Sequence, residues 1–160
     1  MNIYASEWDV ERAPLGVNER FAHIGRSLGG ELLGATMFEV EPGWQSLYHL
    51  HYANEELLLV VDGTPTLRTP DGERELRPGD TALFRRGPAG THQIANRSDG
   101  PARFVVFSSM VDPDVVEQPE AGTVGVFVGG VPTSGRDAEI ELFFPREAAV
   151  GYFEIPRSES

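Results

Sequence analysis

The sequence predicts an all-β fold, in which many short strands form a sandwich or a closed barrel. Eighteen glycines and twelve prolines are spread along the 160 residues, which favours short strands joined by turns over long helices. Between these turn residues, apolar side chains alternate with polar ones or form short branched runs. The chain has no heptad, internal repeat or low-complexity tract. We therefore expect one domain over residues 1–160.

The strands are expected in a regular order after an irregular arm over residues 1–18. We expect them at residues 20–28, 31–41, 47–52, 56–61, 66–69, 73–77, 81–85, 92–95 and 103–108. The turn signals between them are strong, above all Pro70-Asp71-Gly72, which predicts a hairpin. Residues 111–120 contain Pro and Asp and are expected to be a connection with at most a short helical turn. Further strands are expected at residues 123–128, 140–144 and 152–155.

Two central strands are apolar on both faces, because alternate residues of a strand point to opposite sides. Leu47, His49 and His51 would face inward, while Tyr48, Leu50 and Tyr52 would face outward. In the next strand Glu56, Leu58 and Val60 would face inward, and Leu57, Leu59 and Val61 outward. A sheet with one solvated face would alternate apolar with polar residues. We therefore expect the terminal arms, a second subunit or both to cover these strands, and we predict a homodimer.

Charge and composition exclude several classes of partner. The formal net charge of −12 repels phosphate backbones and anionic lipid surfaces, so we expect no nucleic-acid or membrane partner. The N-terminal residues lack the basic and apolar regions of a signal peptide, and no apolar run is long enough to span a bilayer. We expect a soluble cytoplasmic protein. Cysteine is absent, which excludes disulfides and thiolate metal sites.

The residues with the clearest chemistry are His49, His51 and Glu56. His49 and His51 are two positions apart on one expected strand, so both imidazoles point to the same side. Glu56 opens the next strand and can turn its carboxylate toward the same space. Imidazole and carboxylate together suit Mn, Fe, Co, Ni, Cu or Zn. The pattern therefore predicts a metal site.

This spacing resembles the first motif of the cupin superfamily, and a later segment resembles the second. The first motif is Gly, five residues, His-x-His, three or four residues, Glu, six residues and Gly, and Gly43, His49, His51, Glu56 and Gly63 fit every interval. In the second motif Gly79, Pro88, Gly90, His92 and Asn96 match in order. The loop between Gly79 and His92 is two residues longer than is usual in the family, with Arg85-Arg86-Gly87 inserted. The chain is similar to small single-domain bacterial cupins of the cupin 2 conserved barrel type.

The resemblance implies a small antiparallel jelly-roll barrel. Its core would cover about residues 34–109, with strand-bearing arms at residues 1–33 and 110–160. His49, His51, Glu56 and His92 would hold one divalent transition metal, for example Fe, Mn, Ni, Zn or Co. Four protein ligands leave two positions open on a six-coordinate ion, where a small molecule or water can bind.

Several residues near these motifs have simpler readings. Glu55 competes with Glu56, but the interval to Gly63 favours Glu56. His23 is the other histidine available as a ligand, and we expect it to be structural. Arg85 and Arg86 are expected to be solvated, and Asn96 is expected to form turn hydrogen bonds. Gly43, Gly63, Gly79 and Gly90 are expected to permit unusual backbone angles at turns.

Two classes of function are compatible with the sequence. The first is a metal-dependent enzyme of oxygenase or isomerase/lyase type that acts on a small polar molecule inside the barrel. The second is a non-catalytic module that senses or stores a small ligand or a metal in the same place. Strand parity turns Tyr48 and Tyr52 away from the expected metal site, which leaves no evident acid or base beside the ligands.

Overall fold

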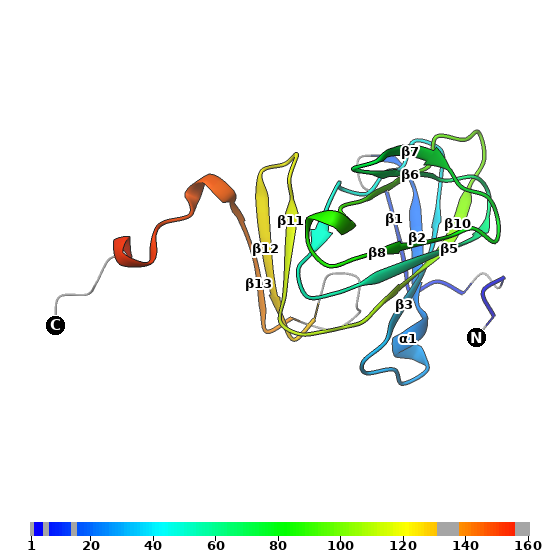
Figure 1. Cartoon of the computed structure of the whole chain (residues 1–160). Coiled ribbons are helices and arrows are strands. Elements are labelled where there is room, and N and C mark those ends of the chain that lie inside the picture. Colours follow the sequence, from blue (N-terminus) through cyan, green and yellow to red (C-terminus); the bar gives the residue numbers. More distant parts are fainter. Residues whose placement is uncertain (1, 5–6, 14–15, 131–137, 156–160) are drawn as a thin grey trace.

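The computed structural model describes residues 2–4, 7–13, 16–130 and 138–155, and it confirms an almost entirely antiparallel β fold (Figure 1). The strands are β1 (Val10–Arg12), β2 (Glu19–His23), β3 (Gly34–Val40), β4 (Leu50–His51), β5 (Glu56–Asp62), β6 (Thr66–Thr69), β7 (Gly72–Glu75), β8 (Thr81–Phe84), β9 (Gln93–Ala95), β10 (Ala102–Ser108), β11 (Asp114–Gln118), β12 (Thr123–Val128) and β13 (Ile140–Pro145). The helical elements are α1 (Ile24–Ser27) and the 3-10 turns η2 (Pro88–Gly90), η3 (Arg146–Ala148) and η4 (Tyr152–Glu154). Within the described residues, no helix has the length and apolar character needed to span a membrane.

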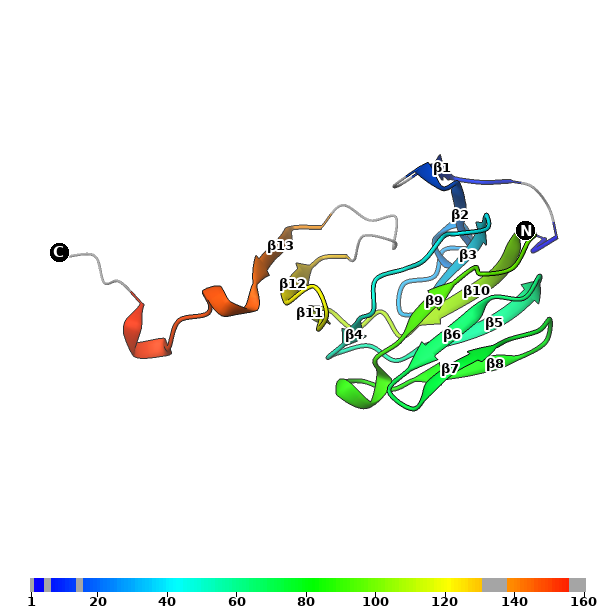
Figure 2. The same cartoon turned by 90° about the horizontal axis from the view of Figure 1, so that it is seen from above.

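The strands form three antiparallel sheets (Figure 2). The largest has the order β1-β2-β3-β10-β5-β8, the second β13-β12-β11-β4 and the third β7-β6-β9. Ladder hydrogen bonds do not join the described strands into one closed barrel. Isolated bridges between Gln45 and Ala95 and between His49 and His92 link the segment before β4 to β9.

The main hydrophobic core lies on the inner side of the six-stranded sheet. It contains Val40, Leu58, Val60, Leu67, Leu76, Phe84, Ile94, Ala102 and Phe104. Leu58 and Val60 are buried, as the alternation along β5 predicts, while Leu57 on the other face is 37% exposed. Burial of these aliphatic and aromatic side chains is the main stabilising contribution to the fold.

A second, smaller core lies on the outer side of the same sheet. Here Met37 and Val105 are buried, and Ile3 and Trp8 of the N-terminal arm pack against this cluster together with Val61. The expectation that a terminal arm covers the outward apolar residues is thus confirmed for this part of the sheet.

Five expected elements were wrong in type or extent. The arm over residues 1–18, expected to be irregular, contains the strand β1, which pairs with β2. Residues 20–28 form β2 followed by α1, and residues 47–52 contain only the two-residue strand β4. Residues 152–155 contain the 3-10 turn η4 and no strand. Residues 111–120 were expected to be a connection but contain β11, in which Val115 and Val116 pair with β12. Favourable ladder partners on both sides outweighed the turn signals of Pro113 and Asp114.

The inward and outward assignment around β4 also needs correction. Leu50, expected to face outward, is 3% exposed, whereas Leu47, expected to face inward, is 61% exposed. β4 pairs with β11 on one side, and η2 lies against it as well. Because other elements surround this short segment, strand parity does not decide which of its residues are buried.

Three of the four expected turn glycines have the unusual backbone angles that were predicted, whereas Gly90 does not. Gly43, Gly63 and Gly79 have φ values of +90°, +74° and +91°, a region that favours glycine. Gly90 has an ordinary φ, but a Cβ there would lie 1.6 Å from the Arg85 carbonyl oxygen, so only glycine fits. Asn96 is fully buried, and its side-chain amide donates to the carbonyl oxygens of Val40 and Gly100.

Candidate metal centre

Three short segments bring the expected ligands together. His49 and His92 are antiparallel bridge partners, with His49 N donating to the His92 carbonyl at 3.0 Å and His92 N to the His49 carbonyl at 2.9 Å. His51 lies on β4, and Glu56 is the first residue of β5. The longer loop before His92 is tied to β4, because Gly87 N donates to the His51 carbonyl oxygen at 2.7 Å.

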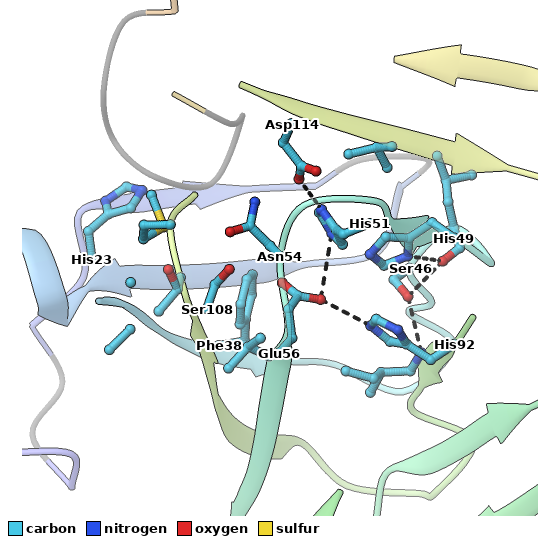
Figure 3. Close-up of a pocket in the computed structure, with 18 of the residues that line it drawn as sticks. His23, Phe38, Ser46, His49, His51, Asn54, Glu56, His92, Ser108 and Asp114 are labelled. Carbon is cyan, nitrogen blue, oxygen red and sulfur yellow. Dashed lines mark hydrogen bonds and ion pairs between the residues drawn. The ribbon is translucent and has the colours of Figure 1, made fainter. Parts of the chain in front are cut away.

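The side chains converge on the carboxylate of Glu56 (Figure 3). One ligand atom each from His49, His51 and Glu56 form a group whose members all lie within 4.8 Å of one another. His92 lies outside this group of three, but its Nε2 is 3.4 Å from Oε2 of Glu56, and Nε2 of His51 is 3.6 Å from the same oxygen. These distances are close to those between donors that share one ion.

Each of the three imidazoles has its Nδ1 occupied by an acceptor. His49 Nδ1 lies 2.8 Å from the Leu47 carbonyl oxygen, and His92 Nδ1 lies 2.9 Å from that of Gly90. His51 Nδ1 lies 2.6 Å from Oδ2 of Asp114. A proton on Nδ1 leaves Nε2 with a free lone pair, the form in which imidazole binds a metal. The donor set therefore fits a divalent transition metal.

Burial lowers the pKa of all three histidines, and neighbouring groups oppose this effect to different extents. Burial lowers the pKa of His49 and lowers that of His92 well below its ordinary value, so both rings stay neutral. Burial also lowers the pKa of His51, but the hydrogen bond to Asp114 and the charge of Glu56 outweigh it, so that pKa is raised. The ring of His92 is further fixed by Phe84, with centroids 3.6 Å apart and planes 6° from parallel.

Asp114 is a site residue that the sequence reasoning missed. It is 1% exposed on β11, and besides His51 its carboxylate accepts a hydrogen bond from Ala53 N at 3.0 Å. Burial raises the pKa of Asp114, but hydrogen bonds from His51, Asn54 and Ala53 outweigh it and keep the pKa low. The branched pair Val115-Val116 directly after it favours a strand, but the sequence around Asp114 carries no signal for its contact with His51.

The other candidates lie apart from this group. Glu55 is exposed, and Arg85 and Arg86 are exposed as predicted. His23 lies on β2 and contacts Asp9, with Nδ1 2.9 Å from Oδ2 of Asp9. Its ring does not join the group at Glu56.

The candidate metal-binding group, formed by His49, His51, Glu56 and His92, opens into a cavity of about 530 Å³. Most of the cavity wall is apolar and aromatic. It includes Phe38, Trp44, Ile94, Phe104, Val106, Val116, Phe127 and Phe143. His49, His51, Glu56, His92 and Asp114 line its polar part. A small molecule can therefore reach the candidate ligands from within an apolar enclosure.

Comparisons with known proteins agree with this geometry. The profile of the cupin domain family (Cupin_2) matches residues 36–108. A solved structure named as a cupin-superfamily sugar phosphate isomerase from Silicibacter pomeroyi is similar with a TM-score of 0.72 and 25% identity, over 86% of this chain and 83% of that one. The polyketide cyclase RemF from Streptomyces resistomycificus is similar with a TM-score of 0.52 and 25% identity, over 60% of this chain and 68% of that one.

Two further comparisons complete the assignment. A Cupin 2 conserved barrel domain protein from Salinispora arenicola has a TM-score of 0.52 and 18% identity, over 68% of this chain and 87% of that one, and supports the fold alone. No curated protein matches the sequence. The family profile, the motif residues gathered at Glu56 and the similar solved structures lead to one assignment: residues 36–108 match the cupin domain family, and the chain has the cupin fold.

Proposed function

We propose that the protein is a metal-dependent enzyme that binds a small molecule in the cavity and rearranges it by isomerase or lyase chemistry. His49, His51, Glu56 and His92 would hold one divalent transition metal. The observation that carries the proposal is the shared state of the three imidazoles. Each has an acceptor at Nδ1, which leaves Nε2 as the nitrogen available to a metal beside the cavity, and Nε2 of His51 and of His92 lie 3.6 and 3.4 Å from Oε2 of Glu56.

The names of two similar proteins favour isomerase or lyase chemistry over oxygenase chemistry. One is a sugar phosphate isomerase and the other a polyketide cyclase, and both are 25% identical to this chain. A divalent ion in such a site supplies Lewis acidity, which polarises a carbonyl or stabilises an enolate. This chemistry requires no change in the oxidation state of the metal.

The residues of the chain would have separable roles in this reaction. Asp114 holds His51 in one tautomer and one orientation through the 2.6 Å contact at Nδ1. Phe84 holds the ring of His92 by stacking. The aromatic wall excludes water and so strengthens electrostatic interactions at the polar part of the cavity.

A non-catalytic binding module is the second candidate. Its support is that Asp114, the second carboxylate near the candidate ligands, is already paired with His51 and so does not serve as an acid or base for a substrate. A bound molecule that raises the melting temperature and is recovered chemically unchanged would favour this second function.

The experiment that tests the proposal measures metal content and turnover together. Protein purified without an affinity tag is analysed for bound elements, and then loaded with Fe(II), Mn(II) or Zn(II). It is incubated with sugar phosphates and hydroxylated aromatic ketones, and products are followed by NMR. We expect about one ion per chain and a metal-dependent product.

A double replacement and a matched control complete this experiment. We expect the His49→Ala/His51→Ala variant to lose both the ion and the product. The His23→Phe variant replaces a histidine outside the group, so it should keep the ion. Turnover that survives the double replacement would contradict the proposal.

A further inference from the structure

His23 lines the same cavity as the metal-binding group but lies well away from it (Figure 3). The sheet register gives the separation. His23 on β2 pairs with Thr36 on β3, Thr36 pairs with Val106 on β10, and Val106 pairs with Leu58 on β5. Three strand spacings therefore separate His23 from the strand that carries Glu56, or about 14 Å between backbones.

The imidazole of His23 has one satisfied and one unsatisfied nitrogen. Asp9 accepts from the backbone N of His23 at 2.6 Å and contacts its Nδ1 at 2.9 Å. Nε2 is buried and has no hydrogen-bond partner among the described residues. A buried polar atom without a partner is unfavourable. Because His23 lines the cavity, a ligand that displaces the atoms covering Nε2 would supply the missing partner.

Apolar side chains separate His23 from the metal-binding group. Phe38 and Phe104 stack with ring centroids 5.4 Å apart, and both line the cavity together with Val106. Val116 and Phe127 contribute to the same wall. Flat rings pack favourably on such aromatic surfaces.

The charged groups around this part of the cavity do not favour a phosphate. Arg12 forms an ion pair with Glu19, and Arg26 interacts electrostatically with Asp9. Glu31 also lines the cavity, and the chain contains no lysine. The carboxylates of Asp9, Glu19 and Glu31 would repel a phosphate group.

We propose that the ligand is an elongated, ring-bearing molecule with oxygen groups at both ends. One end would bind at the metal-binding group, and a hydroxyl at the other end would donate a hydrogen bond to Nε2 of His23. The middle would lie against Phe38 and Phe104. The contact between the ligand and the metal ion rests on the proposed function, whereas the contact between the ligand and His23 does not.

Naphthoic acids are suitable probes for this inference, because they combine a carboxylate, two fused rings and a variable distal group. Binding to the Zn(II)-loaded protein is measured by titration calorimetry for 6-hydroxy-2-naphthoate and for 6-methyl-2-naphthoate, which has similar size but no hydrogen-bond donor. We expect the hydroxy compound to bind about fivefold more tightly. In the His23→Phe variant the two should bind with equal affinity.

The outcomes separate this inference from the proposed function. Equal affinity of the two probes for the unmodified protein would overturn the role of His23, and this comparison stands even if the variant fails to fold. A preference for the hydroxy compound that persists in His23→Phe would overturn it as well. The same titrations with His49→Ala/His51→Ala test whether the probe binds through the metal ion. Unchanged probe affinity in this variant would contradict the proposed function, and the comparison of the two probes would still test the role of His23.

Discussion

The two segments that flank the cupin domain contribute differently to the molecule. The N-terminal segment folds back on its own chain, where Ile3 and Trp8 pack against the outer side of the six-stranded sheet. At the other end, all six residues of the edge strand β13 are exposed, and the described residues after it, 146–155, extend away from the sheets (Figures 1 and 2). Both segments carry large apolar side chains, but Ile3 and Trp8 are packed within the chain, whereas Tyr152 and Phe153 are largely exposed. From this difference we propose that a second copy of the chain covers the C-terminal segment.

The two segments also contribute different residues to the cavity. His23 lines the cavity from the residues before the cupin domain, and Asp114 and Phe127 line it from the residues after the domain. The cupin motifs account for the candidate ligands, whereas the flanking segments complete the surroundings of those ligands. The comparison can be tested by changing each segment in turn.

The largest effect is expected at the exposed C-terminal aromatics. Tyr152 is 79% exposed and Phe153 85% exposed. If they are buried in a homodimer, Tyr152→Ser/Phe153→Ser should raise the dimer dissociation constant by about 100-fold or more, because two large apolar contacts are lost. Light scattering over a concentration series measures this change. Tyr4→Ser, at an N-terminal tyrosine that is 71% exposed, is the control, and an unmodified protein that is monomeric at micromolar concentration would contradict the prediction.

The next largest effect is expected at Asp114. Asp114→Asn keeps an oxygen acceptor but removes the charge beside Nδ1 of His51. We expect the affinity for Zn(II) to fall about 10- to 100-fold, measured by competition with a chelator. Asp112→Asn is the matched control, because Asp112 bonds to Gly129 N at 2.9 Å and is not among the site residues. Equal losses in the two variants would contradict a specific role for Asp114.

A smaller effect is expected at Trp8. Arg20 and Arg103 lie over its ring at 5.0 and 5.2 Å, and its apolar body packs on the outer core. Trp8→Ala should lower the free energy of unfolding by about 2–3 kcal/mol, measured by urea denaturation. The metal content should not change. Glu7→Ala, at an exposed neighbouring position, should have little effect on either quantity.

The smallest effect is expected at Glu39, whose carboxylate bridges Arg20 and Arg103. Burial raises the pKa of Glu39, but the hydrogen bonds from the two arginines outweigh it and lower the pKa. A lowered pKa stabilises the fold above the pKa of the unfolded chain, and this stability is lost as the pH falls through the folded pKa. Glu39→Gln should therefore cost about 1 kcal/mol at pH 7.

The pH dependence distinguishes this ionic effect from a packing effect. The difference in unfolding free energy between Glu39→Gln and the unmodified protein should shrink as the pH falls below 4.5, the ordinary pKa of glutamate. Urea denaturation at a series of pH values measures it. A difference that stays constant down to the lowest accessible pH would show that the charge of Glu39 is not its cause.

The sequence predicted the fold best where turns and alternation agreed. β6 and β12 lie at their expected positions, and β5 and β10 differ by one residue. In each case a glycine or proline turn and a run of branched residues gave the same boundaries. Three of the four candidate ligands, His49, His51 and Glu56, lie within 4.8 Å of one another, as expected from their spacing, although only His51 and Glu56 lie on strands.

The features that the sequence did not predict depend on contacts between distant segments. Asp114 reaches His51 across 63 positions, and nothing in the residues around Asp114 indicates that contact. Leu50 is buried because β11 and η2 lie against its short strand. His23 was expected to be structural, but its place in the cavity wall depends on the pairing of β2 with β3.

The most direct test of the account is the position of a bound metal in a crystal. Crystals of the full chain are soaked with Mn(II) or Zn(II), and the anomalous difference map is calculated. We predict one strong peak about 2.0–2.2 Å from Nε2 of His49, His51 and His92 and from one oxygen of Glu56. A map without a peak among these four side chains, or with its strongest peak at His23, would contradict it.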